Sequence, residues 1–463
     1  GSLVSYSNHG MALAAYIAEQ EMKAPFSKVA ADVMFAPLGM RRTYYIEPAD
    51  SALAADLAPG YRCGPSGCER APITWSHAYP VGLAFSTASD MSRAMRAWLA
   101  QGVLDGEQVL DATAVEAMIH QQFTHDPRLP GIGFGFFEHR YRGHRIVSHA
   151  GGVPGTATVL ALVPSQGIGV FIATNAGEPT VTRTLMEGVL DALLPDESPP
   201  APVAQGPVAE YAGSWKLARY SHHTIEALPG VFAFTMPTWA RGDTLFMPAG
   251  SRERRFVRVD SLLLQEVDDG TRLVLKRDAS GKLTHLYTGM PVGGAELPGA
   301  WERVPWYQGA YFMNEYLSAL LGVPIIILVL WGVVALGAWL WRRRRADRYA
   351  PVPMNRLAVA GIVMSALTVA GFTVFGFGLI AAGTRDLARS QGMAYGMTTM
   401  HIALLRLAWP IALAAVPITF LAIRAWRQRW WNAFGRICYS GLALSAILTA
   451  HLLYAYHYIP GRW

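Results

Sequence analysis

The chain has 463 residues, of which 52% are hydrophobic and only 16% are charged. This composition is too apolar for an ordinary soluble protein and predicts a membrane portion. The formal net charge of +6 comes largely from arginines beside apolar runs near the C-terminus, which membrane topology explains better than nucleic-acid binding does. We therefore expect no nucleic-acid partner. Three cysteines exclude a disulfide framework; Cys63 and Cys68 either bridge or remain two free thiols of a loop.

The first 194 residues mix helical and strand-like patterns. Helical periodicity covers residues 10–21 and 87–101. Strand-like runs follow at residues 145–147, 158–163 and 169–174. These patterns predict an α/β or α+β domain. Residues 195–207 are rich in proline and alanine and predict an extended linker at a domain boundary.

Residues 208–305 contain short alternating segments separated by turn signals. The segments are residues 231–235, 244–247, 255–259, 261–267, 272–277 and 283–288. This spacing is typical of a small antiparallel β-sandwich or barrel, which would be a β-rich accessory domain. We find no catalytic cluster there, and we interpret His222, His223 and His285 as surface or packing residues.

Four apolar segments of spanning length fill the last region, residues 306–463. They cover residues 316–341, 357–383, 397–423 and 437–458. The connections after the first and third segments are rich in arginine, whereas the connection after the second holds only Arg385 and Arg389. The positive-inside rule then places the two arginine-rich connections in the cytoplasm and both chain ends outside. We expect a multi-pass, four-helix domain in the lipid bilayer of the cell (inner or cytoplasmic) membrane, with the soluble domains on its extracytoplasmic side.

Five short motifs in the first region carry the chemistry. They are Tyr6-Ser7-Asn8; Pro37-Leu38-Gly39-Met40 with Thr43; Gly82-Leu83 with Ser86-Thr87-Ala88-Ser89-Asp90-Met91; Gly133-Phe134-Gly135-Phe136; and His149-Ala150-Gly151-Gly152 with Pro154-Gly155. In this order they resemble the serine β-lactamase and penicillin-binding superfamily, in its branch of class C β-lactamases, D-alanyl-D-alanine peptidases and esterases. The resemblance covers residues 1–194. It implies the C-terminal portion of a β-lactamase/transpeptidase-like α/β domain and an acyl-enzyme mechanism.

The resemblance assigns roles to Tyr6, Asn8, His149, Gly151 and Gly152. A tyrosine acts as the general base only beside a cation, because an unperturbed phenol is almost fully protonated at neutral pH. The Asn8 carboxamide would bridge the catalytic lysine and a substrate carbonyl. His149 stands at the family's Lys-Thr-Gly or His-x-Gly position. The glycines let a substrate backbone approach, and the Gly152 N–H would donate to the oxyanion.

The Ser-x-x-Lys nucleophile of the family does not occur in this chain. None of the lysines has a serine three positions before it; they are Lys23, Lys28, Lys216, Lys276 and Lys282. We therefore expect an N-terminally truncated, inactive fragment of a membrane-anchored hydrolase. Its substrate would be a small molecule or peptide that is an ester, a D-amino peptide or β-lactam-like. Histidine in place of lysine at position 149 argues against β-lactamase activity itself, because histidine is largely neutral at pH 7.

No cofactor or metal is expected. His139, His144 and His149 recur every five residues, a spacing that alternates between the faces of a strand. Two alternatives remain. The chain would be a nucleophile-less extracytoplasmic binding or sensor protein, or the spans would form a transport-associated module with His401 and Arg406 as its polar residues.

Overall fold

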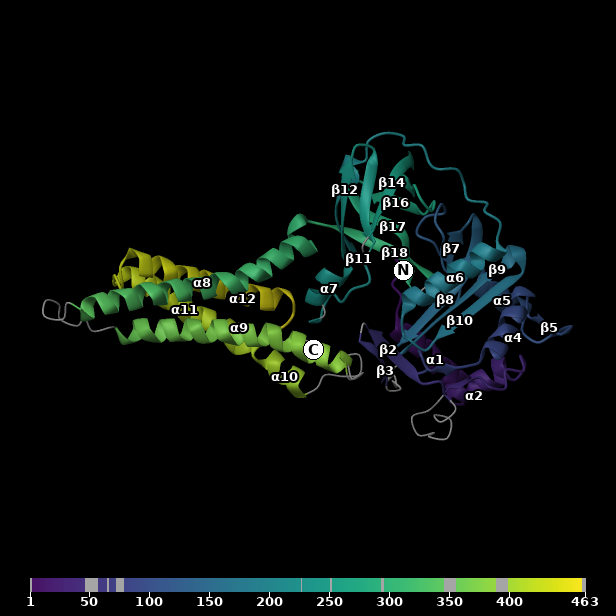
Figure 1. Ribbon diagram of the computed structural model, residues 1–463, viewed down its shortest axis with the longest axis horizontal. Coiled ribbons are helices and arrows are strands. Elements are labelled where there is room, and N and C mark those ends of the chain that lie inside the picture. Colours follow the sequence, from purple (N-terminus) through teal and green to yellow (C-terminus); the bar gives the residue numbers. More distant parts are fainter. Residues whose placement is uncertain are drawn as a thin grey trace. The chain divides into compact units, whose positions relative to one another are not determined.

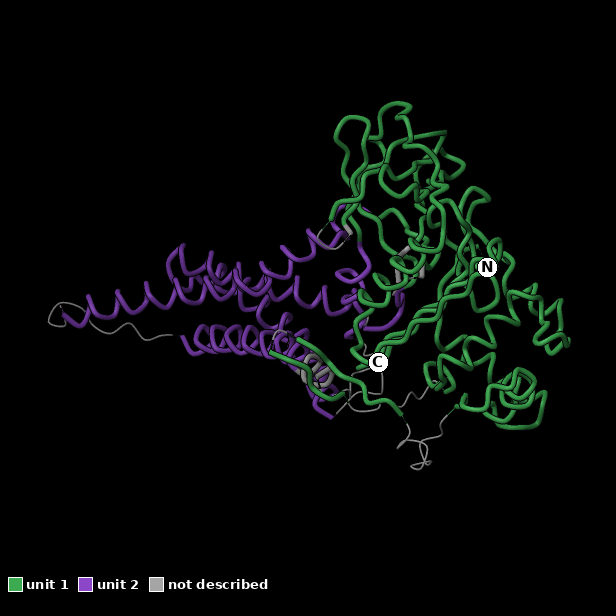
Figure 2. The backbone as a smooth tube through the Cα atoms, turned by 45° about the vertical axis from the view of Figure 1, so that its right-hand side comes forward, with its two compact units in different colours: residues 1–219, 236–304 green, residues 220–235, 305–463 purple. Residues whose placement is uncertain are grey.

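The computed structural model describes residues 2–45, 57–64, 66–71, 79–225, 227–249, 252–292, 295–344, 355–388 and 399–459. The chain divides into two compact units (Figure 2). Unit 1 comprises Gly1–Arg219 and Met236–Val304, and unit 2 comprises Tyr220–Thr235 and Pro305–Trp463. Arg345, Arg348 and Arg389 of the predicted membrane connections lie outside the described residues.

A four-stranded antiparallel sheet organises the first part of unit 1 (Figure 1). Its strands are β7 (Phe137–Tyr141), β8 (His144–Val153), β9 (Thr156–Val163) and β10 (Ile168–Thr174), in the order β10-β9-β8-β7. Strands β7 and β8 form a hairpin whose turn residues Arg142 and Gly143 both have positive φ. That conformation matches the right-handed twist of the two strands. All three strand-like runs predicted in this region lie within β8, β9 and β10.

Both faces of this sheet are covered. Val147 and Leu162 pack with α4 (Ala88–Leu99), whereas Ile146 and Ala161 pack with α6 (Pro179–Leu193). Because successive side chains alternate between two buried faces, β9 is almost continuously apolar. The other elements here are α1 (Asn8–Met22), α2 (Phe26–Ala30), the π-helical turn η1 (Ala31–Phe35), α5 (Ala112–Ile119), η2 (Pro164–Gln166), and the short strands β1 (Tyr44–Tyr45), β4 (Ala84–Phe85), β5 (Val103–Leu104) and β6 (Glu107–Gln108).

A separate hairpin holds two of the three cysteines. Strands β2 (Gly60–Gly64) and β3 (Gly67–Ala71) place Cys63 opposite Cys68. The two residues form a disulfide, which decides between the two alternatives that the sequence left open.

The second part of unit 1 is a closed antiparallel barrel. Its strands are β11 (Gly213–Leu217), β12 (Thr235–Arg241), β13 (Thr244–Ala249), β14 (Arg252–Asp260), β15 (Leu263–Glu266), β16 (Arg272–Arg277), β17 (Leu283–Val292) and β18 (Ala295–Val304), preceded by η3 (Ala209–Tyr211). Fully buried Trp215, Phe256 and Leu286 belong to its core. The predicted "sandwich or barrel" is therefore a barrel, and closure leaves it no free edge strand.

One predicted strand of the barrel region is wrong. Residues 231–234 belong to α7 (Ala227–Phe234), and β12 begins only at Thr235. A short apolar run does not distinguish a strand from a buried helix by its periodicity. Here the deciding contact is tertiary, because Val231 packs in an apolar cluster of unit 2 with Met313 and Leu320.

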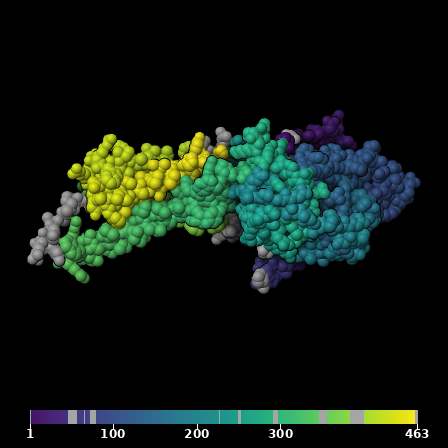
Figure 3. Space-filling view, turned by 90° about the horizontal axis from the view of Figure 1, so that it is seen from above, coloured from purple at the N-terminus to yellow at the C-terminus, as the bar shows by residue number. Residues whose placement is uncertain are grey.

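Unit 2 contains four helices long and apolar enough to cross a membrane, as the sequence predicts. Its elements are η4 (Trp306–Gln308), α8 (Ala310–Arg343), α9 (Arg356–Ala388), α10 (Thr399–Arg406), α11 (Ala408–Arg427) and α12 (Ala433–Ala455). Figure 3 shows the yellow α12 lying along the green α8. The third span is interrupted at Leu407 between α10 and α11. Pro410 has no N–H for the Arg406 carbonyl, which helps to explain the interruption.

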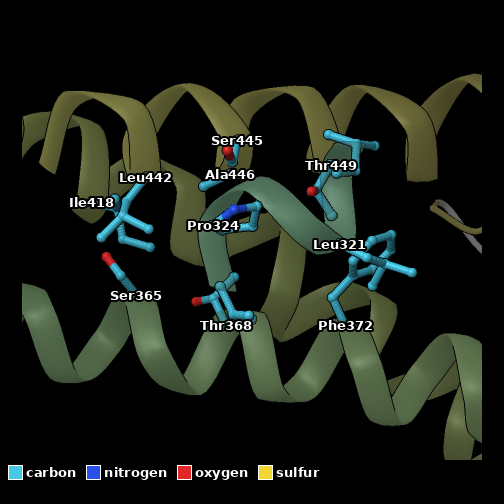
Figure 4. A pocket seen from close by; sticks show the side chains of 12 residues that line it. Leu321, Pro324, Ser365, Thr368, Phe372, Ile418, Leu442, Ser445, Ala446 and Thr449 are labelled. Atoms are coloured by element: carbon cyan, nitrogen blue, oxygen red, sulfur yellow. The ribbon is translucent and has the colours of Figure 1, made fainter. Parts of the chain in front are cut away.

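A small cavity lies among the helices of unit 2 (Figure 4). Its volume is about 20 Å³, and its lining includes Pro324 of α8 together with the hydroxyl-bearing Thr368, Ser445 and Thr449. The space suffices for one water-sized molecule. The Thr368 hydroxyl donates to the Met364 carbonyl within its own helix, so this hydroxyl is compatible with an apolar environment.

Candidate active site

Tyr6 lies in the extended segment just before α1 and is half-buried among side chains from three other places in unit 1. Its ring meets the edge of Phe137 on β7, with the ring centroids 5.8 Å apart, and lies 6.3 Å from the ring of His149 on β8. The guanidinium carbon of Arg219 lies 4.9 Å from the centre of the Tyr6 ring. Two residues that the sequence assigned to one site, Tyr6 and His149, are therefore neighbours.

His149 is largely removed from solvent and stacks on Phe137 at 5.0 Å. Burial lowers the pKa of His149, and a backbone hydrogen bond at Ala150 opposes this only in part. The imidazole is consequently neutral at pH 7. It offers a hydrogen-bonding group to this surface but no positive charge.

The strand after His149 has an unpaired edge. Pairing of β7 with β8 ends at Phe137 and Ser148, whereas β9 continues to pair with β8 as far as Val153. Within the part of the chain that the structure describes, no strand covers the other edge of residues 149–153. Backbone groups on this edge, which alternate with those that pair with β9, are available to an added extended segment.

Gly151 and Gly152 lie on this open strand, and both are exposed. A Cβ atom added at Gly151 would lie 2.8 Å from the Thr158 hydroxyl, whereas one at Gly152 would meet nothing closer than the Thr156 carbonyl at 4.0 Å. Successive side chains alternate between the two faces of a strand. The two adjacent glycines therefore leave both faces of the strand without a side chain at this point.

Asn8 is the first residue of α1 and is exposed. The residue that caps the helix is Ser7, whose hydroxyl accepts a hydrogen bond of 3.0 Å from the Gly10 N–H. This arrangement leaves the Asn8 carboxamide free of the capping role. Asn8 follows Tyr6 by two residues in the sequence and therefore lies near it.

Two other motifs serve the scaffold. Asp90, at the start of α4, is buried and accepts hydrogen bonds of 2.8 Å from the Arg42 N–H and the Thr43 hydroxyl. The Thr43 and Ser86 hydroxyls are 2.7 Å apart. These contacts join segments that the sequence identified as separate landmarks, and they hold α4 against the segment around Thr43.

Two residues of the cluster were not predicted. Phe137 directly follows the Gly133–Phe136 motif, and the Arg142-Gly143 turn was a usable signal for the hairpin that brings it beside His149. Arg219 follows strand β11 of the barrel, and no local sequence pattern predicts its contact with Tyr6. Among the described residues no group of three or more His, Cys, Asp or Glu side chains is placed to hold a metal ion.

Comparison with known proteins agrees with the sequence motifs. A family model described as Beta-lactamase matches residues 1–193. The chain is similar to the D-alanyl-D-alanine-carboxypeptidase/endopeptidase AmpH of Escherichia coli (strain K12), with 24% identity over 201 residues, 41% of this chain and 50% of that protein. It is also similar to the unguisins hydrolase ungD' of Aspergillus campestris (strain IBT 28561), with 28% identity over 178 residues, 37% of this chain and 33% of that protein.

Among solved structures, the chain is similar to the class C beta lactamase from Rhodobacter sphaeroides. The identity is 20%, the match covers 41% of this chain and 61% of that chain, and the TM-score is 0.34. The chain spans at most half the length of each of these two curated relatives.

Proposed function

We propose that residues 1–193, which belong to the serine β-lactamase and penicillin-binding superfamily, form the substrate-binding part of an acyl-transfer cleft. The observation that carries this proposal is the open edge of β8 at residues 149–153 beside Tyr6. An extended peptide or amide pairs with such an edge as an additional strand. The substrate class that fits is an ester or amide of a D-amino acid or short D-amino peptide, with β-lactam-like molecules as its cyclic relatives.

In the proposed chemistry a serine oxygen attacks the acyl carbon and the leaving group departs with a proton. Tyr6 takes part in moving that proton, and the Gly152 N–H donates to the negative oxygen that develops. Asn8 holds the substrate amide through its carboxamide. Gly151 leaves the strand without a side chain that would obstruct the substrate. Neutral His149 supplies a hydrogen bond at the start of the open strand segment. Water then hydrolyses the acyl-enzyme.

The serine and lysine of this chemistry would have to come from outside the 463 residues, which contain no Ser-x-x-Lys. We expect that the chain alone forms no acyl-enzyme. Incubation with a fluorescent penicillin and with a fluorescent fluorophosphonate, followed by denaturing electrophoresis, checks this, with a superfamily member that has an intact motif as positive control. A covalently labelled band from this chain would show that another nucleophile operates in it.

Substrate binding does not require the nucleophile, so the cleft is testable in the chain as it stands. We expect N-acetyl-D-alanyl-D-alanine to bind, and Gly152→Leu to weaken binding about tenfold or more, a loss of about 1.4 kcal/mol. The open space around Gly152 accommodates the new side chain without disturbing the fold, so the loss reports obstruction of the edge.

Isothermal calorimetry in detergent micelles measures this binding. The matched control is Gly188→Leu, also in open surroundings but on α6, which should bind as the unchanged chain does. If the Gly152→Leu variant binds the ligand as tightly as the unchanged chain does, the edge of β8 is not part of the binding site.

We also propose that the four apolar helices anchor the protein in a membrane with the soluble domains on the extracytoplasmic side. Trp331 of α8 contacts Trp431 of the α11–α12 connection, with ring centroids 4.9 Å apart. This contact packs the middle of α8 against the connection before α12. Arg342 and Arg343 lie in the last turn of α8, and Arg424 and Arg427 lie in the last turn of α11, the next helix but one in the predicted order of spans. Basic residues at the ends of the first and third spans support the orientation expected from the positive-inside rule.

Cysteine accessibility in intact cells tests the orientation. In a Cys438→Ser background, a membrane-impermeant maleimide should label a Ser280→Cys variant in the barrel of intact cells. It should label an Arg348→Cys variant only after the cells are lysed. The reverse pattern would place the soluble domains in the cytoplasm, and labelling of neither variant before lysis would contradict the proposal that α8 crosses the membrane.

A further inference from the structure

Arg219 is held at the end of a barrel strand. Leu217, the last residue of β11, pairs with Trp301 of β18, and the Ala218 N–H donates to the Ala300 carbonyl at 2.7 Å. The ladder therefore fixes the backbone up to the residue before Arg219. From this position the guanidinium lies over the Tyr6 ring.

The segment that carries Tyr6 is fixed against the same part of the barrel. Leu3 and Ala218 pack against one apolar cluster that includes Tyr287 and Ala300. The Val4 N–H donates to the His125 imidazole at 3.0 Å, and the His125 ring stacks on Tyr287 at 4.6 Å. Both partners of the contact between Arg219 and Tyr6 are therefore held in place by neighbouring contacts with the barrel.

The charge of Arg219 is not neutralised in its surroundings. In the portion of the chain covered by the structure, no carboxylate pairs with this half-buried guanidinium, whereas most other half-buried arginines of the barrel region, such as Arg254 with Glu266, have such a partner. Neutral His149 adds no positive charge. The cluster of Tyr6, Phe137, His149 and Arg219 therefore contains one cation and no anion.

We propose that Arg219 binds an anionic group of the substrate, in the first place a C-terminal carboxylate, so that the barrel helps to determine specificity. A guanidinium presents a planar pair of donors that matches a carboxylate in a bidentate arrangement. The strand position that would carry a lysine is occupied by a neutral histidine, and the cation comes instead from the accessory barrel. This inference rests on the proposed function of the cleft.

The test compares two ligands that differ only in charge, N-acetyl-D-alanyl-D-alanine and its C-terminal amide. Their dissociation constants are measured by calorimetry on the 463-residue chain in micelles. We expect the carboxylate to bind about tenfold more tightly than the amide, as a charge-assisted pair warrants. Arg219→Gln should abolish this preference while leaving the affinity for the amide unchanged, and Arg219→Lys should retain part of it.

The matched control is Arg241→Gln, because Arg241 also lies 4.9 Å from the centre of an aromatic ring, that of Phe246, on the same barrel. It should leave the preference intact. If Arg219 only held Tyr6 in place, Arg219→Gln would weaken both ligands equally, and the proposal would be overturned; persistence of the preference would overturn it too.

Different results would refute the role of Arg219 and the cleft. Equal affinity of the unchanged chain for the acid and the amide would refute the role of Arg219 and leave the cleft standing. If neither ligand binds, the proposed cleft itself is refuted. Should Arg219→Gln not fold, the comparison between the unchanged chain and Arg219→Lys still decides.

Discussion

Replacement of Trp215 by alanine is expected to lower the free energy of unfolding of the barrel by about 3–5 kcal/mol. Trp215 on β11 is completely buried, and its ring lies in the barrel core with Phe256 and Leu264. Its indole N–H donates to the Thr238 hydroxyl at 3.1 Å. The truncation leaves a cavity in a closed structure that cannot easily collapse, and it removes the indole donor from a buried hydroxyl.

Hydrogen–deuterium exchange of the full chain, read from peptides of β13 to β17, measures this loss where it occurs. The matched control is Trp239→Ala on the neighbouring strand β12, because Trp239 is only half-buried and stacks on Phe246 at the barrel surface. The control should destabilise the barrel much less. Equal effects of the two variants would mean that Trp215 is not a central core residue.

The secondary structure was predictable where the local pattern alone decides it. The apolar runs of β8 to β10 and most of the alternating segments of the barrel give strands because turn residues end each of them. The prediction failed at residues 231–234, where Val231 joins the core of unit 2 and the run becomes helical. Closure of the barrel by pairing of β11 with β18 was beyond sequence reasoning too, because the two strands are far apart in the chain.

The candidate site was likewise predictable only where local motifs decide it. Tyr6, Asn8, His149, Gly151 and Gly152 were predicted as site residues because they stand in recognisable motifs, and the structure adds the ring contact between Tyr6 and His149. The open edge of β8 follows from how far β7 extends, which depends on the hairpin register and not on composition. The bond between Cys63 and Cys68 likewise depends on register, since the two face each other across a hairpin.

Lowering the pH from about 6.5 to 4 is expected to destabilise unit 1 by about 3 kcal/mol through His139 alone. His139 on β7 is buried, and this burial lowers its pKa from 6.5 to about 4. Below pH 6.5 the unfolded chain takes up a proton at this histidine, whereas the folded chain does not until about pH 4. The unfolded state binds more protons across this window, so stability falls as the pH falls.

Urea unfolding followed by pulsed hydrogen–deuterium exchange, read from peptides of β8 and β9 at several pH values, measures the effect. His139→Gln does not titrate and should make the dependence between pH 6.5 and 4 less steep. Its contact with the Ser148 hydroxyl, 3.3 Å away, is lost or altered at every pH and therefore shifts the whole curve, not its slope. His120→Gln, at an exposed position, is the control and should keep the slope.

The slope of the unchanged chain also contains a share from His125, whose pKa is lowered to about 4 by burial and by the nearby His285 and Lys276. The decisive quantity is therefore the difference between the unchanged chain and the His139→Gln variant. A difference near zero would mean that solvent reaches His139 in the folded protein, and the packing of β7 against its neighbours would then be looser than the structure has it. A difference of about 3 kcal/mol would establish that the strand leading into the candidate site excludes water at this position.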